Sequence, residues 1–189
     1  MELLDAITAY RPWNEQERMD REELLRRLRS GEALYTRDNR AAHLTASAWV
    51  VSPDRRQVLM AYHNLYDSWA WLGGHADGER DLLAVALREV REESGLTKVR
   101  AVSPDIYSLE ILTVDGHEKH GKYVSSHLHM NVTFLLEANP SAPIRSKPDE
   151  NSRVAWFTLD GAVAASSEPW MRDRIYRKLN EKLRKSSNF

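Results

Sequence analysis

The stretch "DLLAVALREVREESGL" (residues 81–96) contains the strongest helix signal in the chain. It begins with an acidic residue, which the positive end of a helix dipole favours, and it stops at Gly95, a residue suited to the left-handed cap that ends a helix. Successive helical residues turn by about 100°, so Glu89, Glu92 and Glu93 share one face while the aliphatic residues share another. We therefore predict a helix over 81–95 that packs one face into a core and presents three carboxylates on the other.

The three glutamates repel one another, at a cost of a few tenths of a kcal/mol for each like-charged pair. A hard divalent cation such as Mg²⁺ would offset this repulsion, because it takes carboxylate oxygens as ligands and commonly links them to substrate phosphates. Arg88 stands four residues before Glu92, so its guanidinium group can orient one of the carboxylates. The alternative interpretation is a solvated charged face, which is the usual origin of such a run when it stands alone.

The segment before the helix, "SWAWLGGHADGER" (68–80), contains the paired glycines Gly73 and Gly74. Glycines allow a close approach between a strand and the helix, and a backbone carbonyl there could serve as a further metal ligand. Together with the helix, this segment resembles the signature of the Nudix (MutT-like) hydrolase family, G-x5-E-x7-R-E-U-x-E-E-x-G-U, in which U is a bulky aliphatic residue. Counted from Gly74, the chain matches the signature at Arg88, Glu89, Val90, Glu92, Glu93, Gly95 and Leu96.

Two departures from the family pattern concern the segment before the helix. The first glutamate of the signature would fall where this chain has Arg80, and Glu79 stands one residue early. In the family this glutamate looks chiefly structural, so we expect its displacement to alter the loop rather than catalysis. The approach to the glycines is also similar to the family's W-x-L-P-G-G, with Trp69 in place but with Trp71 and Leu72 instead of the usual leucine and proline.

The resemblance implies an enzyme that uses water and Mg²⁺ (or Mn²⁺) to hydrolyse a diphosphate linkage, usually in a nucleoside diphosphate joined to another group. It implies that Glu89, Glu92 and Glu93 are metal ligands, with the carbonyl of Gly73 as a further one. It also implies that Arg88 orients the acidic group and that one glutamate doubles as general base.

A second acidic candidate lies in the loop segment "KPDEN" (147–151). Several branches of the family supply a glutamate from a loop in this region, which reaches the metals or acts as general base. Glu150 is the candidate in this chain, Asp149 is the second choice, and an ordinary polar turn is the alternative. The catalytic candidates are therefore Glu93, Glu89, Arg88 and Glu150.

The segment "SSHLHMNVTFLLEA" (125–138) alternates polar and apolar residues with the period of a strand. If helices cover both faces of the sheet, the polar face must look into a cleft, so we predict that His127 and His129 line the substrate pocket. The alternative is an exposed edge strand with two surface histidines. Trp71 could stack on a flat group of the substrate, although aromatic residues before a tight turn often belong to the core. Gly74 completes the predicted substrate contacts.

The remaining pattern predicts an α/β fold with a mixed sheet, because strands and helices are intermixed rather than strictly alternating. The family resemblance implies an α/β/α sandwich. Residues 1–40 are predicted to form a helical arm, and residues 41–189 the hydrolase domain with a closing C-terminal helix. The individual predictions are helices at 14–30 and 170–183, a hairpin of strands 45–53 and 57–63, strands at 106–114, 123–137 and 153–159, and a long loop at 139–151.

Composition restricts the partners of this chain of 189 residues. Its 27 basic and 28 acidic residues give a formal net charge of -1, so it has no overall field that would draw it to nucleic acid or to an anionic membrane. No apolar run approaches the roughly 18 residues that span a bilayer, and the N-terminus lacks the pattern of a leader. We therefore expect a cytoplasmic protein whose partner is a small-molecule diphosphate, and we leave a homodimer open.

Two alternative functions are weighed against the hydrolase. The family's isopentenyl diphosphate isomerase branch relies, in its metal-dependent form, on a catalytic cysteine, and this chain has no cysteine at all. A non-catalytic ligand sensor of the same fold is expected to carry a degenerate signature, whereas the three glutamates are intact here. The identity of the diphosphate is not determined, because loops form the pocket walls and one fold serves many leaving groups.

Overall fold

The computed structural model describes residues 2–119 and 121–186. A curled sheet of eight strands forms the centre, with the order β10-β2-β1-β9-β5, and β3, β4 and β6 pair with β2, β1 and β9 respectively. The pairing of β1 with β9 is parallel and that with β2 is antiparallel, so the sheet is mixed, as predicted. The strands are β1 (Ala42–Val51), β2 (Gln57–His63), β3 (Ser68–Ala70), β4 (Leu72–His75), β5 (Val99–Ala101), β6 (Ser108–Val114), β9 (His127–Ala138) and β10 (Asn151–Thr158), with a separate hairpin of β7 (His117–Lys119) and β8 (Lys122–Val124).

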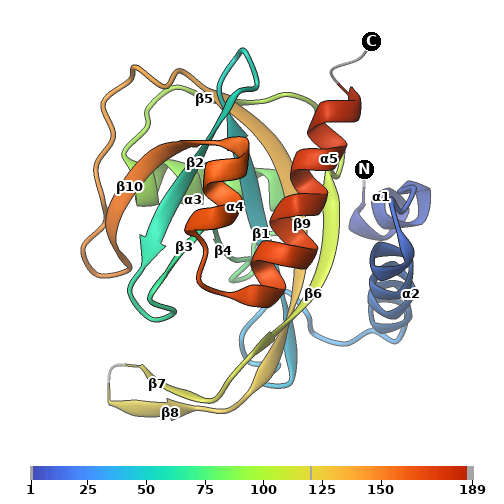
Figure 1. Ribbon diagram of the computed structural model, residues 1–189. Helices are drawn as coiled ribbons and strands as arrows, with labels where there is room; N and C mark the ends of the chain where they lie inside the picture. Colours follow the sequence, from blue (N-terminus) through green and yellow to red (C-terminus); the bar gives the residue numbers. More distant parts are fainter. Residues whose placement is uncertain (1, 120, 187–189) are drawn as a thin grey trace.

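Helices cover both faces of the sheet (Figure 1). They are α1 (Leu3–Ala9), α2 (Glu15–Arg29), α3 (Leu82–Ser94), α4 (Leu159–Ala165), the π-helix η1 (Met171–Tyr176) and α5 (Arg177–Ser186). One core lies between the sheet and α3, and it includes Val85 and Val90 of α3 together with Ala46 of β1. A second core lies on the other face, where Trp49 of β1 stacks on Tyr176 of η1 with 5.3 Å between the ring centroids. All ten residues of β1 are buried as a result, and the predicted α/β/α sandwich is confirmed.

Helix α3 has the ends that the sequence predicts for it. The side chain of Asp81 accepts a hydrogen bond from the Ala84 N–H at 3.0 Å, which satisfies one of the free donors at the start of the helix. Gly95 ends the helix with a φ of 71°, a left-handed conformation that glycine adopts without a steric penalty. The boundaries of the glutamate-bearing helix are therefore fixed by its own cap residues.

Other predicted elements differ from the structure in detail. The predicted hairpin forms, with Val51 opposite Val58, whereas the predicted strand 123–137 is divided between β8 and β9. The closing helix begins with the π-helix η1 before it continues as α5. The short elements α1, α4, β3, β4, β5 and β7 were not predicted, because segments of three to seven residues are too short to show a clear periodicity. Residues 187–189 of the predicted domain lie outside the described residues.

The N-terminal segment forms two helices, α1 and α2, which lie beside β6 (Figure 1). Leu24 and Leu25 of α2 belong to the same core as α3 and the sheet. Glu17 is fully buried, and its Oε1 atom lies 3.2 Å from the Nζ atom of Lys178 and 2.9 Å from that of Lys182, both on α5. The first helices are thus joined by apolar packing and by ion pairs to elements from the middle and the end of the chain.

Within the described residues, no helix combines the length and the apolar character that crossing a membrane would require.

Candidate active site

The two glycines of β4 bring this strand against the glutamate face of α3. The Gly73 N–H donates a hydrogen bond to Oε2 of Glu93 at 3.0 Å. A Cβ atom on Gly73 would lie 2.5 Å from the carbonyl oxygen of Ala46, and one on Gly74 would lie 2.5 Å from Cδ of Glu89. Any side chain at Gly73 would collide with the central strand, and any at Gly74 with the carboxylate of Glu89. Glycine at both positions therefore leaves room for the two glutamates.

Glu93 is a buried carboxyl group with few polar contacts. Burial raises its pKa to about 8, and the nearby carboxylates of Glu89 and Glu150 add to this effect, while the hydrogen bond from Gly73 opposes it. Burial likewise raises the pKa of Glu89, against the opposing effect of Arg88. A divalent cation at these oxygens would return Glu93 to its ionised form, because the charge of the cation compensates for the lost hydration. The donor set is therefore suited to a hard cation.

Arg88 contacts a different glutamate from the one that helical spacing favours. Its Nη2 atom lies 2.8 Å from Oε1 of Glu89, whereas its Nε atom lies 4.0 Å from the nearest carboxylate oxygen of Glu92. The same Nη2 atom also donates to the carbonyl oxygen of His75 at 3.4 Å. Arg88 thus links the end of β4 to α3 and holds the Glu89 carboxylate in place.

The long loop before β10 reaches the glutamates of α3. Lys147 Nζ lies 3.0 Å from Oε2 of Glu150 and 3.4 Å from Oε2 of Glu92. The buried side chain of Asn151 donates to the carbonyl oxygen of Glu93 at 3.2 Å and accepts the Lys147 N–H at 3.0 Å, which fastens the loop to the end of the helix. The structure therefore places Glu150 beside the glutamate face of α3. Lys147 was not predicted, since one lysine in a polar loop gives no distinct signal.

The displaced glutamate of the signature lies outside this contact network. Oε1 of Glu79 accepts the Asp81 N–H at 2.9 Å, next to the start of α3. Arg80, which occupies the signature position, lies over the ring of Tyr35, with 5.0 Å between the guanidinium carbon and the ring centroid. Both side chains thus make their contacts next to the segment between β4 and α3, and the effect of the displacement on catalysis stays a prediction.

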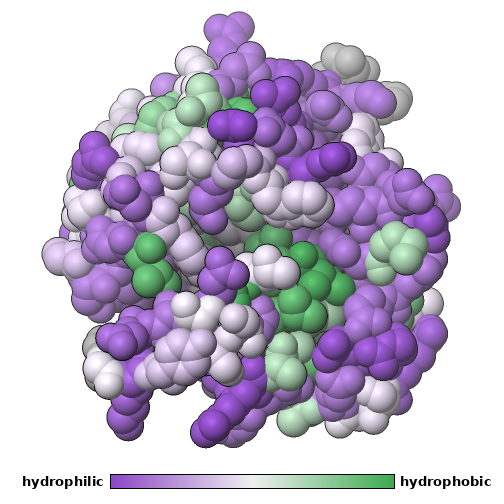
Figure 2. All heavy atoms as spheres, turned by 60° about the horizontal axis from the view of Figure 1, so that its bottom comes forward, coloured by the Kyte–Doolittle hydropathy of each residue, from purple (hydrophilic) through white to green (hydrophobic). Residues whose placement is uncertain are grey.

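A cleft of about 1610 Å³ runs along the glutamates and the polar face of the sheet. All of the predicted site residues line it: Trp71, Gly73, Gly74, Arg88, Glu89, Glu92, Glu93, His127, His129 and Glu150. Arg37 and Arg40, which follow α2, also line the cleft, whereas α1 and α2 contribute no lining residue. Figure 2 turns the lower end of Figure 1 toward the reader and shows a hollowed surface where hydrophobic atoms are exposed within a mainly hydrophilic border.

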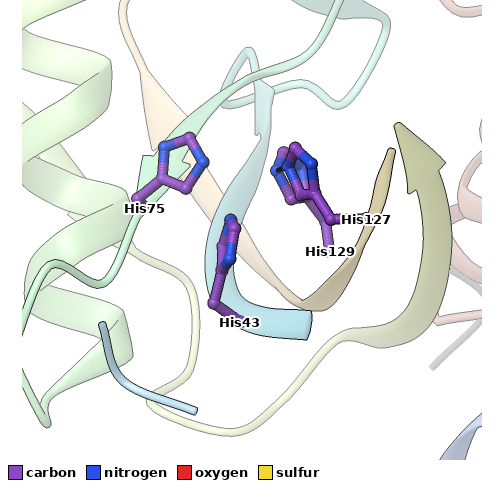
Figure 3. A group of neighbouring side chains, drawn as sticks. All are labelled: His43, His75, His127 and His129. Atoms are coloured by element: carbon purple, nitrogen blue, oxygen red, sulfur yellow. Dashed lines mark hydrogen bonds between the residues drawn. The ribbon is translucent and has the colours of Figure 1, made fainter. Parts of the chain in front are cut away.

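The two predicted pocket histidines belong to a larger group. His127 and His129 lie on β9, which pairs with β1 on one side and with β5 and β6 on the other, so the edge-strand alternative is wrong. His43 of β1 and His75 of β4 lie next to them, and the rings of all four point toward a common space (Figure 3). Burial and the neighbouring imidazoles lower the pKa of His129 to about 2, so this ring is neutral. Sequence analysis missed His43 and His75 because they lie far from β9 along the chain.

Trp71 is half-buried and lines the cleft. Its ring meets that of Tyr176 edge to face, with 5.7 Å between the ring centroids, and its backbone N–H donates to the Tyr176 hydroxyl at 3.2 Å. Trp69 packs instead between Tyr62 and Phe157, away from the residues that line the cleft. Of the two tryptophans, only Trp71 can contact a ligand in the cleft while it also packs against the core.

The fold and this site together define a class of protein, the pyrophosphohydrolases built on a mixed sheet between two layers of helices. The model of one family, the NUDIX domain, matches residues 41–179. This match spans most of the chain, and the chain therefore belongs to the NUDIX domain family.

Several solved structures share the fold. A Caenorhabditis elegans Ap4A hydrolase in a binary complex is 21% identical, with 75% of this chain and 98% of that chain covered and a TM-score of 0.54. The dihydroneopterin triphosphate pyrophosphohydrolase of E. coli is 16% identical, with coverages of 71% and 92% and a TM-score of 0.54. A NUDIX-family hydrolase from Clostridium perfringens is 18% identical, with coverages of 74% and 97% and a TM-score of 0.51. No curated protein sequence matches this chain significantly.

Proposed function

We propose that this protein is a Mg²⁺- or Mn²⁺-dependent hydrolase that cleaves the diphosphate linkage of an organic pyrophosphate, such as a nucleoside diphosphate joined to another group. The main support is the buried carboxyl group of Glu93, which Gly73 holds at the wall of the cleft beside Glu89. Burial of a carboxylate is unfavourable unless a cation accompanies it. The buried carboxyl group of Glu93 lies in a cleft, and the chain belongs to a family of pyrophosphate hydrolases. Both facts support a catalytic rather than a structural role for Glu93.

In this proposal Glu89, Glu92 and Glu93 hold the metal, with the carbonyl of Gly73 as a further ligand. The bound cation would supply neutralisation of phosphate charge and a bound water of lowered pKa. Arg88 keeps the Glu89 carboxylate turned toward Gly74, as its contact of 2.8 Å indicates.

Glu150 is the proposed general base, with the carboxylates of α3 as the alternative. It lies on the loop before β10, and Lys147 is its ion-pair partner at 3.0 Å. A general base accepts a proton from the attacking water and then releases it, which suits the half-exposed carboxylate of Glu150 better than the buried one of Glu93. Substitution of Glu150 by glutamine is expected to lower kcat by on the order of 100-fold with little change in KM, and unchanged turnover would remove this role.

The remaining cleft residues are proposed to bind the substrate. His127 and His129 offer ring nitrogens to phosphate or to the group beyond it, Trp71 offers an aromatic edge, and Gly74 allows a close backbone approach. A volume of about 1610 Å³ exceeds what a drug-sized ligand needs, so it favours a substrate of nucleotide size or larger. The names of two structural neighbours, an Ap4A hydrolase and a dihydroneopterin triphosphate pyrophosphohydrolase, support a substrate that combines a phosphate chain with a heterocycle.

A panel of organic pyrophosphates, assayed with Mg²⁺ and with Mn²⁺, tests the proposal. It would contain nucleotide sugars, dinucleoside polyphosphates, ADP-ribose and nucleoside triphosphates, and ¹⁸O-labelled water would show which phosphorus atom is attacked. We expect turnover of at least one compound to fall by on the order of 1000-fold in Glu93→Gln. Glu181→Gln, which alters an exposed carboxylate on α5, is the matched control and should keep wild-type turnover.

The same panel separates the hydrolase from a ligand sensor. A sensor would bind one of these compounds, measured by calorimetry, without releasing any phosphate-containing product. Binding without turnover in the presence of either cation would therefore contradict the proposal.

A further inference from the structure

Four histidines from three strands, β1, β4 and β9, meet in the cleft. The strand pairing explains why: His43 of β1 stands opposite His129 of β9, and Thr45, two residues further along β1, stands opposite His75 of β4. Alternation along β9 places His127 on the same face as His129. The rings consequently project from three backbones toward one space (Figure 3).

The spacing of these rings is close to that of a metal centre. One ring nitrogen from each histidine can be chosen so that all four lie within 4.8 Å of one another. The Nε2 atoms of His127 and His129 are 3.2 Å apart. Around a tetrahedral Zn²⁺ with bonds of about 2.05 Å, ligand nitrogens stand about 3.3 Å apart. The widest pairs would therefore close by up to about 1.5 Å through rotation of their side chains. The four histidines therefore already hold one possible ligand nitrogen each around a common point.

Hydrogen bonds to the far nitrogens orient two of the rings. Nδ1 of His43 lies 3.1 Å from the carbonyl oxygen of Asn39, and Nδ1 of His127 lies 2.8 Å from that of Ser125. A carbonyl oxygen only accepts, so each Nδ1 carries the proton and each Nε2 keeps its lone pair. Histidines that bind metals commonly donate the other N–H to a backbone carbonyl in this manner.

Nε2 of His43 provides an independent indication of a ligand. This atom is buried, and it has no hydrogen-bond partner in the structure. Leaving a buried acceptor without a partner costs about 1–3 kcal/mol, so such atoms are rare unless a ligand satisfies them. The unpaired nitrogen belongs to a ring whose centroid lies 4.8 to 5.2 Å from the centroids of the other three.

We propose that His43, His75, His127 and His129 form a second metal site, which binds a Zn²⁺-type transition-metal cation. Imidazole nitrogens suit Zn²⁺, Cu²⁺, Ni²⁺ and Co²⁺, whereas Mg²⁺ prefers oxygen ligands. This site therefore differs in cation preference from the carboxylates of α3. All four histidines line the cleft, so the cation would face the same space as the substrate. The proposal does not depend on the hydrolase activity.

Cobalt binding to the full-length protein tests this site without an activity assay. Purified protein, first treated with a chelator, is titrated with Co²⁺ and its visible absorption is recorded. We expect one equivalent of Co²⁺ to give the intense bands of a tetrahedral nitrogen site, Zn²⁺ to displace it at equimolar concentration, and millimolar Mg²⁺ to leave it bound. Weak octahedral bands only, or displacement by Mg²⁺, would overturn the proposal.

Variants distinguish the histidines from the glutamates as ligands. His127→Asn and His129→Asn should each weaken Zn²⁺ binding by on the order of 100-fold or more, since loss of a direct ligand costs at least as much as loss of an outer partner. His117→Asn is the matched control, because His117 lies near His127, at 6.3 Å between ring centroids, but outside the group. Glu93→Gln should also retain Co²⁺ at this site. Loss of Co²⁺ in Glu93→Gln but not in His129→Asn, with circular dichroism showing folded variants, would assign the cation to α3 and refute the site.

Discussion

Glutamine in place of Glu93 should stabilise the metal-free protein at alkaline pH, although the same change should abolish turnover. Burial raises the pKa of Glu93 from 4.5 to about 8. A carboxyl group whose pKa is raised by folding contributes stability below its unfolded pKa, and this contribution is lost as the pH rises through the folded value. One pKa unit corresponds to about 1.4 kcal/mol, so the wild-type protein should lose about 4 kcal/mol from this group between about pH 5 and pH 8.5.

Urea unfolding, followed by tryptophan fluorescence in the presence of EDTA, measures this loss. The glutamine side chain can still accept the Gly73 N–H but does not ionise, so the Glu93→Gln variant should lack the alkaline decline. Glu92→Gln is the matched control, because Glu92 is on the same helix but its side chain is 47% exposed. We expect this control to follow the wild-type dependence on pH.

Parallel declines in wild type and Glu93→Gln would show that Glu93 does not hold a buried proton, and the electrostatic basis of the proposed site would fail. Addition of Mg²⁺ provides a second criterion. At about pH 8.5 the cation should raise the free energy of unfolding of the wild type more than that of Glu93→Gln, because ligand binding to the folded state stabilises it in proportion to affinity. Equal effects of Mg²⁺ on both proteins would argue against Glu93 as a ligand.

Three further predictions concern the glycines of β4, the buried Glu17 and the loop residue Lys147. Gly73→Ala should lower stability by roughly 1–3 kcal/mol, because its Cβ would lie 2.5 Å from a backbone oxygen of β1. Gly74→Ala should mainly lower kcat, because its Cβ would displace the flexible Glu89 side chain; thermal unfolding measures the first effect and steady-state kinetics the second. Burial opposes ionisation of Glu17, but two lysines of α5 outweigh it and lower its pKa to about 2. The stability that ionised Glu17 contributes is therefore present above pH 4.5 and is lost as the pH falls toward 2. Burial also lowers the pKa of Lys182, which offsets part of the stability gained from the ion pairs. Glu17→Gln should therefore lower the free energy of unfolding by about 2 kcal/mol at neutral pH. Lys147→Met should tighten Mn²⁺ binding in calorimetry by about threefold to tenfold, because the Lys147 ammonium group competes with the metal for the carboxylate of Glu92.

Each of these three predictions has a clear contrary result. Equal losses of stability in Gly73→Ala and Gly74→Ala would mean that the strand can shift away from both new methyl groups. A Glu17→Gln protein that still loses the wild-type amount of stability between pH 4.5 and 2 would place the acid sensitivity elsewhere. Unchanged or weaker Mn²⁺ binding in Lys147→Met would indicate that the lysine assists the site rather than competing for it.

The N-terminal boundary shows how far local pattern extends. The family model begins at residue 41, and the sequence predicts a separate helical arm before it. The structure instead places Leu24 and Leu25 in the main core and Glu17 between two lysines of α5. We propose that residues 1–40 fold as part of the same unit as the hydrolase domain. Spacing of leucines predicts a helix, but the surface against which the helix packs depends on residues more than a hundred positions away.

Sequence alone determined the glutamate-bearing helix, its cap residues, the glycines before it and the family. These features are local, because helical periodicity, caps and close glycine approaches depend on residues within one or two turns of each other. Only the tertiary structure brought Lys147 and Glu150 to α3, and His43 and His75 to the histidines of β9. These contacts join segments that are far apart in the chain, and they follow from strand register and loop path. Both are set by the packing of the whole sheet, which no local pattern of side chains specifies.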